Sequence, residues 1–99
     1  MSLDLYDVWY FLMGFLMANG VPHFVFGRAG KLFRSPFGQR SPPKTNVAWG
    51  SANFALATII GLALAYMRLY DSYSIALLLL GFWFMVLNFG YSIKRFLNE

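Results

Sequence analysis

Three long stretches of the sequence contain no Asp, Glu, Lys or Arg, and this feature limits the possible folds more than any other. They cover Val8–Gly27, Thr45–Met67 and Ser72–Ile93. A helix of about twenty residues is about 30 Å long, which matches the hydrocarbon thickness of a bilayer. The chain is 59% hydrophobic and 12% charged, about half the charge of an ordinary soluble domain. We therefore predict an all-α integral membrane protein forming a single domain, 1–99, with three transmembrane helices at about 6–27, 45–68 and 72–94.

The first of these stretches is interrupted near its end by Asn19, Pro22 and His23. Proline removes one backbone hydrogen bond and clashes with the carbonyl four residues earlier in a helix. We therefore expect either a kink near Ala18 or a helix that ends early and continues as a short turn.

The segment 28–44, between the first and second stretches, carries several cations and no acid. Its Ser-Pro pairs predict turns and extended chain. Leu32, Phe33 and Phe37 are interspersed among the cations, which is typical of a segment that lies on a membrane surface. Each basic residue near an anionic surface contributes about 1 kcal/mol of attraction. The alternative is an ordinary solvated loop.

The distribution of charge predicts the orientation through the positive-inside rule. The residues before the first stretch include acids but no Lys or Arg, unlike a secretory signal peptide, so we expect the N-terminus to be retained. We predict a multi-pass protein of a bacterial inner membrane with its N-terminus outside, a basic cytoplasmic loop and a cytoplasmic C-terminus. This orientation places in the cytoplasm Arg28, Lys31, Arg34, Arg40, Lys44, Lys94 and Arg95, and outside Arg68 with Asp4, Asp7 and Asp71.

Polar residues inside the stretches are expected to meet at one depth. Asn53 lies about 10 Å beyond Asn46 along the second helix, and Asn88 lies about 8 Å from the end of the third. Asn19 and His23 fall near the same surface. On the second helix Asn46, Trp49, Gly50, Asn53, Ala57 and Gly61 follow one face, and on the third Ser74, Gly81 and Asn88 recur every seven residues.

Two interpretations of this polar layer remain open. Asparagines can join membrane helices, each contact contributing about 0.6 kcal/mol. Alternatively, the layer is a pocket open to the cytoplasm, because polar groups placed in hydrocarbon often mark sites. The positive end of the second helix and the nearby cations would then favour an anion such as a phosphate or carboxylate. The candidate ligand-binding residues are His23, Asn19, Asn46, Trp49, Asn53, Asn88, Arg28, Arg34 and Lys44.

A catalytic or metal-binding role finds little support in the sequence. His23 is the single histidine, and the chain has no cysteine and no acid inside a stretch. We therefore expect no enzyme, no cofactor and no metal, and interpret His23 as a polar residue at a helix end. Haem ligation within an oligomer and base catalysis on a lipid are the alternatives. Binding of nucleic acid is not expected, because the cations lie against a membrane.

The middle of the chain resembles a family of small bacterial membrane proteins. The resemblance rests on His23-Phe24 followed by Gly27, on Pro36-Phe37, and on Asn46 with Trp49-Gly50 and Asn53. It implies a bacterial inner-membrane setting and implies no activity.

We therefore expect a small non-enzymatic inner-membrane protein that binds an anionic lipid head group or a small anionic ligand. Small residues at Gly14 and Ala18, and along Ala57-Gly61-Ala65, could pack between chains, so a homo-oligomer is expected. One alternative is a subunit of a small multimeric transporter or channel. Another is an accessory subunit of a larger membrane complex that docks through the third helix.

Overall fold

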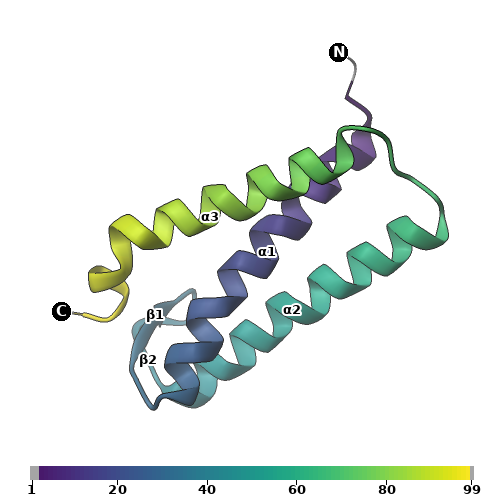
Figure 1. Cartoon of the computed structure of the whole chain (residues 1–99). Helices are drawn as coiled ribbons and strands as arrows, with labels where there is room; N and C mark the ends of the chain where they lie inside the picture. The colour runs from purple at the N-terminus through teal and green to yellow at the C-terminus, as the bar shows by residue number, and fades with distance from the viewer. Residues whose placement is uncertain (1–2, 99) are drawn as a thin grey trace.

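The computed structural model describes residues 3–98 and consists of helices with one short hairpin (Figure 1). All three helices are long and apolar enough to cross a membrane, which confirms the predicted all-α fold with three helices of that length and composition. The elements in chain order are α1 (Leu5–Arg28), β1 (Phe33–Ser35), β2 (Gly38–Ser41), α2 (Pro43–Tyr66) and α3 (Ser74–Phe96).

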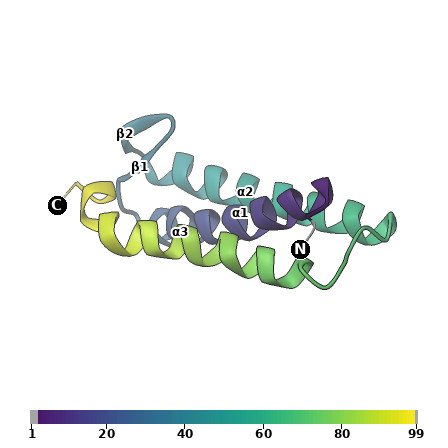
Figure 2. The same ribbon diagram turned by 90° about the horizontal axis from the view of Figure 1, so that it is seen from above.

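Helix α1 lies in the middle, with α2 and α3 on either side of it (Figures 1 and 2). It packs along both neighbours, whereas α2 and α3 barely touch each other within residues 3–98. The hairpin, the end of α1, the start of α2 and the end of α3 gather at one end, which we call the basic end. The start of α1 and the connection between α2 and α3 form the opposite end, which we call the acidic end.

Glycines allow the helices to approach closely on both sides of α1. A Cβ on Gly14 would overlap the carbonyl oxygen of Leu78 in α3, and one on Gly81 would overlap that of Phe11. On the α2 side, a Cβ on Gly50 would lie 2.8 Å from the carbonyl oxygen of Gly20. Close backbone contact increases van der Waals packing, which is a main source of helix association in membranes.

Several small residues expected to pack between chains are used inside this one. Gly14, Ala18 and Ala57 are buried within the chain. The prediction that these three residues pack against a second copy of the chain is therefore wrong, since the same residues cannot pack against two partners. The physical reason is that α1 has a neighbour on both sides and needs a small-residue face toward each.

Proline lies inside one helix and at the start of another. Helix α1 runs through Pro22 to Arg28, close to the predicted 6–27, so of the two outcomes expected at Pro22 the early end does not occur. Its neighbours on both sides hold it, and one missing hydrogen bond is tolerated in such packed helices. Helix α2 begins at Pro43. Proline fits this first position because the N–H group that it lacks would have no partner within the helix.

The basic segment forms an antiparallel hairpin with Phe33 opposite Ser41 and Ser35 opposite Gly38. Phe33 is fully buried, so the prediction that it lies on a membrane surface is wrong for this residue. Phe37, by contrast, is 68% exposed. The hairpin thus inserts one aromatic side chain between the helix ends and keeps the next at the surface. Phe33 packs on the rings of His23, Phe26, Phe89 and Phe96.

Candidate functional site at the basic end

His23 and Asn46 form a buried pair between α1 and α2. The Nδ1 atom of His23 lies 2.8 Å from Oδ1 of Asn46, and both side chains are almost completely buried. An amide oxygen can only accept a hydrogen bond, so Nδ1 of His23 carries the hydrogen and donates it. The pair therefore selects one tautomer of the histidine.

The amide nitrogen of Asn46 holds the hairpin against the start of α2. It donates to the carbonyl oxygens of Phe33 at 2.8 Å and of Ser41 at 3.1 Å, with a longer contact of 3.4 Å to Pro42. With His23 on its oxygen, the Asn46 side chain has all its hydrogen-bonding groups engaged. Asn46 therefore connects three parts of the chain, and because it is completely buried it presents no group to a ligand.

A second pair lies one to two turns deeper. Nδ2 of Asn19 donates to Oδ1 of Asn53 at 3.0 Å, and Nδ2 of Asn53 donates to the carbonyl oxygen of Trp49 at 2.8 Å. The indole nitrogen of Trp49 is buried and has no hydrogen-bond partner in the described part of the chain. Its ring meets Phe37 of the hairpin edge-on, with centroids 5.5 Å apart. These asparagines join α1 to α2.

Asn88 does not reach these residues. It is exposed on α3 and donates to the carbonyl oxygen of Phe84 in its own helix, at 3.0 Å. Ser74 and Gly81 are buried on the face toward α1, but Phe89 follows them there instead of Asn88. Successive residues of a helix point about 100° apart, so Asn88 and Phe89 cannot both face α1, and the structure places Phe89 there. The expectation that Asn88 shares the layer is thus wrong.

The cations predicted for the site divide into two groups. Arg28 and Lys44 line a surface hollow of about 340 Å³ at the junction of α1 and α2, together with Gly27, Pro43, Val47 and Ala48. Arg34 lies elsewhere, with its guanidinium carbon 5.8 Å from the centre of the Phe96 ring at the end of α3. The structure therefore brings Arg28 and Lys44 together at a surface hollow that is not lined by the buried asparagines.

Close contact of the two backbones forms the floor of this hollow. A Cβ on Gly27 would lie 2.8 Å from the carbonyl oxygen of Pro43 and 2.9 Å from the backbone nitrogen of Val47. Glycine at position 27 therefore lets the start of α2 pass directly against the end of α1. This close contact places Arg28 and Lys44 at the rim of the same hollow.

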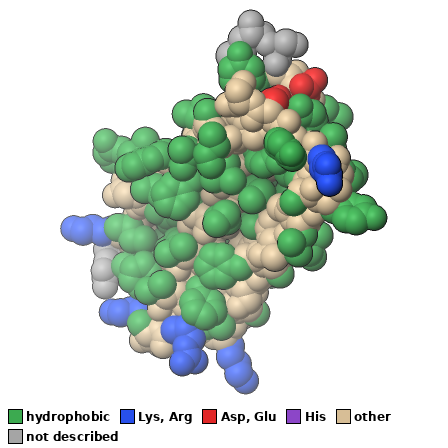
Figure 3. Space-filling model, turned by 45° about the vertical axis from the view of Figure 1, so that its right-hand side comes forward, with side chains coloured by type: hydrophobic (Ala, Val, Ile, Leu, Met, Phe, Trp, Pro, Cys, Tyr) green, Lys and Arg blue, Asp and Glu red, His purple; other side chains and the backbone are tan. Residues whose placement is uncertain are grey.

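Charge is separated along the length of the molecule. Figure 3 shows most of the Lys and Arg side chains on this face toward the lower end, and acidic side chains at the top with one basic side chain near them. The described acids are Asp4, Asp7 and Asp71, and all three lie at the acidic end. The hollow at Arg28 and Lys44 is therefore far from any of these carboxylates.

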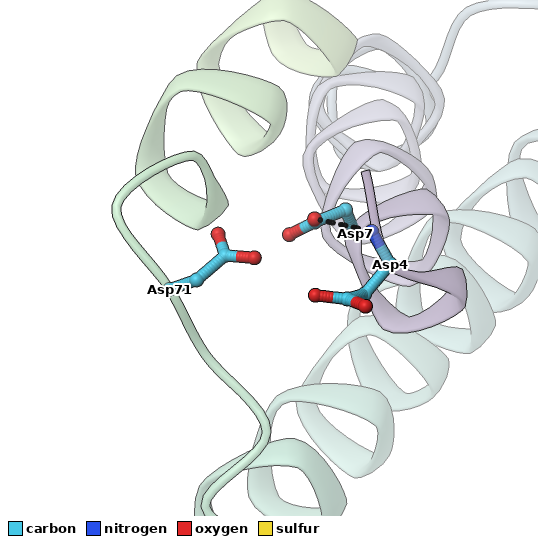
Figure 4. A group of neighbouring side chains, drawn as sticks. All are labelled: Asp4, Asp7 and Asp71. Carbon is cyan, nitrogen blue, oxygen red and sulfur yellow. Dashed lines mark hydrogen bonds between the residues drawn. The ribbon is translucent and has the colours of Figure 1, made fainter. Parts of the chain in front are cut away.

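The three aspartates form a cluster that the sequence reasoning did not assemble (Figure 4). Their nearest ligand atoms all lie within 4.8 Å of one another, and carboxylate oxygens suit hard cations such as Ca²⁺. Each buried oxygen also has partners in the chain: Asp7 accepts from the N–H of Asp4 at 3.1 Å, and Asp71 from the hydroxyl of Tyr6 at 3.2 Å. The sequence pointed to this cluster in one respect. Asp4 and Asp7 lie at the start of α1 and Asp71 lies just before α3, and both helices begin at the same end of the molecule.

The pKa of the Asp71 carboxyl is lower than its ordinary value. Burial alone would raise this pKa, but hydrogen bonds from the Tyr73 N–H and from the Tyr6 and Ser74 hydroxyls favour the ionised form. The Tyr73 N–H lies 2.8 Å from Oδ1 of Asp71. Asp71 thus acts as a charged anchor for the first turn of α3.

Comparisons with protein-family models, with curated proteins and with solved structures found no match to this chain.

Proposed function

We propose that this is an integral membrane protein that binds the head group of an anionic lipid at its basic end, without catalysing a reaction. The hollow between Arg28 and Lys44 carries this proposal. Insertion in a bilayer is supported by the apolar windows of the three helices, of which only 22%, 28% and 17% is buried inside the chain. The remaining apolar surface needs hydrocarbon around it. By the positive-inside rule the basic end faces the cytoplasm and the N-terminus lies outside.

The electrostatics of the hollow favour a phosphate group. Pro43 and Lys44 begin α2 and line the hollow, so the partial positive charge at the start of this helix lies beside it. Two cations at the rim each add about 1 kcal/mol of attraction to an anionic surface. Lys31, Arg34, Arg40, Lys94 and Arg95 carry further positive charge in the same part of the chain.

The proposal moves the ligand from the asparagine layer to the neighbouring surface. His23, Asn19, Asn46 and Asn53 bind one another or the backbone, which supports a role in joining the helices. A transporter or channel would need polar groups that continue toward the acidic end. In the described part of the chain, the two hollows between α1 and α2 toward the acidic end are lined mainly by apolar side chains, so the transporter or channel alternative gains no support.

Head-group binding can be measured by native mass spectrometry after purification from mixed phosphatidylglycerol and phosphatidylcholine. We expect Arg28→Gln and Lys44→Gln each to reduce retention of phosphatidylglycerol about fivefold, which corresponds to about 1 kcal/mol. Lys31→Gln removes the same charge outside the hollow and should have a smaller effect. An equal loss in all three variants would indicate diffuse attraction and would overturn the proposed site.

The same spectra report the oligomeric state. We propose a homo-oligomer as well, but its interface cannot use Gly14, Ala18 or Ala57, which are buried inside the chain. It would have to use apolar side chains that the chain leaves exposed, such as Leu56 and Leu62 of α2. A bare monomer in every condition would contradict this part of the proposal.

A second candidate function is an accessory subunit that docks through α3. One face of this helix exposes large apolar side chains that recur at steps of three and four residues. Co-purification of an unrelated membrane subunit, lost when this face is altered, would favour docking over lipid binding. The face consists of Leu80, Trp83, Phe84, Leu87 and Tyr91.

A further inference from the structure

We propose that the site accommodates more than a head group: an acyl chain of the same anionic lipid lies along the junction of α1 and α2 and ends in a second, apolar hollow. This inference rests on the proposed function. The second hollow has a volume of about 370 Å³. Its lining residues are Met13, Met17, Phe54, Ala57, Thr58, Gly61 and Leu62.

The two hollows lie on the same side of the α1–α2 junction. On α2, steps of three or four residues lead from Lys44 and Val47, which line the first hollow, to Phe54 and Thr58, which line the second. The corresponding steps on α1 lead from Arg28 through Phe24 to Met17 and Met13. Residues separated by such steps form one continuous helix face.

The packing between the two hollows is compatible with a chain running along this face. Phe24 of α1 and Phe54 of α2 pack against each other with ring centroids 5.9 Å apart. These rings lie on the junction and offer an apolar surface between the cationic rim and the second hollow. A lipid chain therefore meets apolar surface along this path.

The depth of the second hollow matches the reach of a lipid held at its head group. Thr58 lies about 21 Å beyond Lys44 along the helix axis. One leaflet of the hydrocarbon core is about 15 Å thick, and the head-group layer adds several ångströms. A chain that starts at Arg28 and Lys44 therefore arrives in the second hollow near the middle of the bilayer.

The lining of the second hollow is suited to a methylene chain. The Met13 side chain packs directly against Gly61, since a Cβ there would lie 3.1 Å from the Cε atom of Met13. Met side chains are flexible and adapt to irregular apolar partners. The hydroxyl of Thr58 donates to the carbonyl oxygen of Phe54 at 2.8 Å, so its donor is not left unpaired against hydrocarbon.

Charge separates this path from the larger hollow on the other side of the junction. That hollow, of about 500 Å³, is lined by Leu5, Trp9 and Ile59 among others and lies toward the acidic end. Asp4 and Asp7 lie beside its α1 residues in sequence, and anionic lipid is repelled there. The hollow at Met13 and Gly61 is thus the one that shares a helix face with the cationic rim.

The test compares retention of dioleoyl-phosphatidylglycerol by native mass spectrometry in variants of the full chain. Thr58→Phe places a ring in the second hollow and should lower retention roughly tenfold, as expected when about two methylenes lose their contacts. Thr58→Val removes the hydroxyl without filling the space and should retain the lipid. Ala63→Phe fills the opposite hollow and should also retain it.

The outcomes distinguish this inference from the proposed function. Loss in Arg28→Gln without loss in Thr58→Phe would leave the head-group site intact and overturn the acyl-chain path. Loss in neither variant would overturn both. A dimer that disappears in Thr58→Phe, with lipid retained, would show that a second copy fills the hollow and would also overturn the inference.

A second measurement keeps the inference testable if Thr58→Phe does not fold. The wild-type chain should retain dioleoyl-phosphatidylglycerol several-fold better than dihexanoyl-phosphatidylglycerol, whose chains are too short to reach Met13 and Gly61. Equal retention of the two lipids would indicate binding of the head group alone.

Discussion

At the scale of single residues, two asparagines that look alike in the sequence have different roles. Asn46 is completely buried and connects His23 with the hairpin backbone, whereas Asn53 binds Asn19, which is only partly buried. An unpaired buried donor or acceptor costs about 1–3 kcal/mol, and an interhelical asparagine contact contributes about 0.6 kcal/mol. The two residues should therefore differ in their effect on stability.

We predict that Asn46→Ala lowers the free energy of unfolding by at least about 2 kcal/mol, because it leaves the His23 donor and the Phe33 carbonyl unpaired. Asn53→Ala should lower it by about 0.6 kcal/mol. The measurement is unfolding by SDS from mixed micelles, followed by circular dichroism. Equal losses in the two variants would show that Asn46 is an ordinary interhelical contact.

The sequence predicted the polar layer of His23 and the asparagines only in part. The depth argument placed His23, Asn19, Asn46 and Asn53 in one layer, and the structure divides them into two hydrogen-bonded pairs at successive depths. It failed for Asn88, because rotation around the helix axis is decided by which face α1 covers. The hydrogen-bond partners of Asn46 could not be predicted, since they are backbone carbonyls of a hairpin that the sequence did not reveal.

At the scale of elements, the contact between α1 and α3 depends on glycines whose missing Cβ atoms let the backbones meet. Gly14 and Gly81 lie against each other's helix, while Gly90, farther along α3, has nothing within 4 Å of the position of a Cβ. The close contact at Gly14 and the open space at Gly90 offer a matched comparison.

We expect Gly14→Ala to lower the free energy of unfolding by about 1–3 kcal/mol, because the added methyl forces the two backbones apart. Gly90→Ala should raise it by up to about 1 kcal/mol through higher helix propensity, with no clash. The same SDS titration measures both. If Gly14→Ala is as stable as the wild type, α1 and α3 pack less closely than the structure indicates.

The hairpin shows why element-level prediction was incomplete. Its turn and extended-chain signals were visible in the Ser-Pro pairs, but strand pairing over 33–41 was not predicted. Phe33 decides the position of the hairpin, because its ring fills the space between the ends of α1 and α3. That space exists only once the three helices have packed.

At the scale of the whole molecule, the separation of charge supports one orientation in the membrane. Because the chain contains no cysteine, single cysteines report on exposure without background. In spheroplasts treated with a membrane-impermeant maleimide, we predict labelling of Ser72→Cys. Gln39→Cys should stay unlabelled until the membrane is permeabilised. The reverse pattern would contradict the positive-inside assignment and place the lipid site on the outer leaflet.

The sequence by itself determined the features that depend on composition and on distance along the chain. Three uncharged stretches predicted three helices, and the spacing of charges predicted a basic and an acidic end, because length and polarity act locally. Only the tertiary structure decided that α1 is central and that small residues such as Gly14 and Ala57 pack within the chain. Tertiary packing also decided that Arg28 and Lys44 share a hollow while Arg34 does not. These features depend on how each helix is rotated and which helices are neighbours, and such choices follow from the packing of residues far apart in sequence.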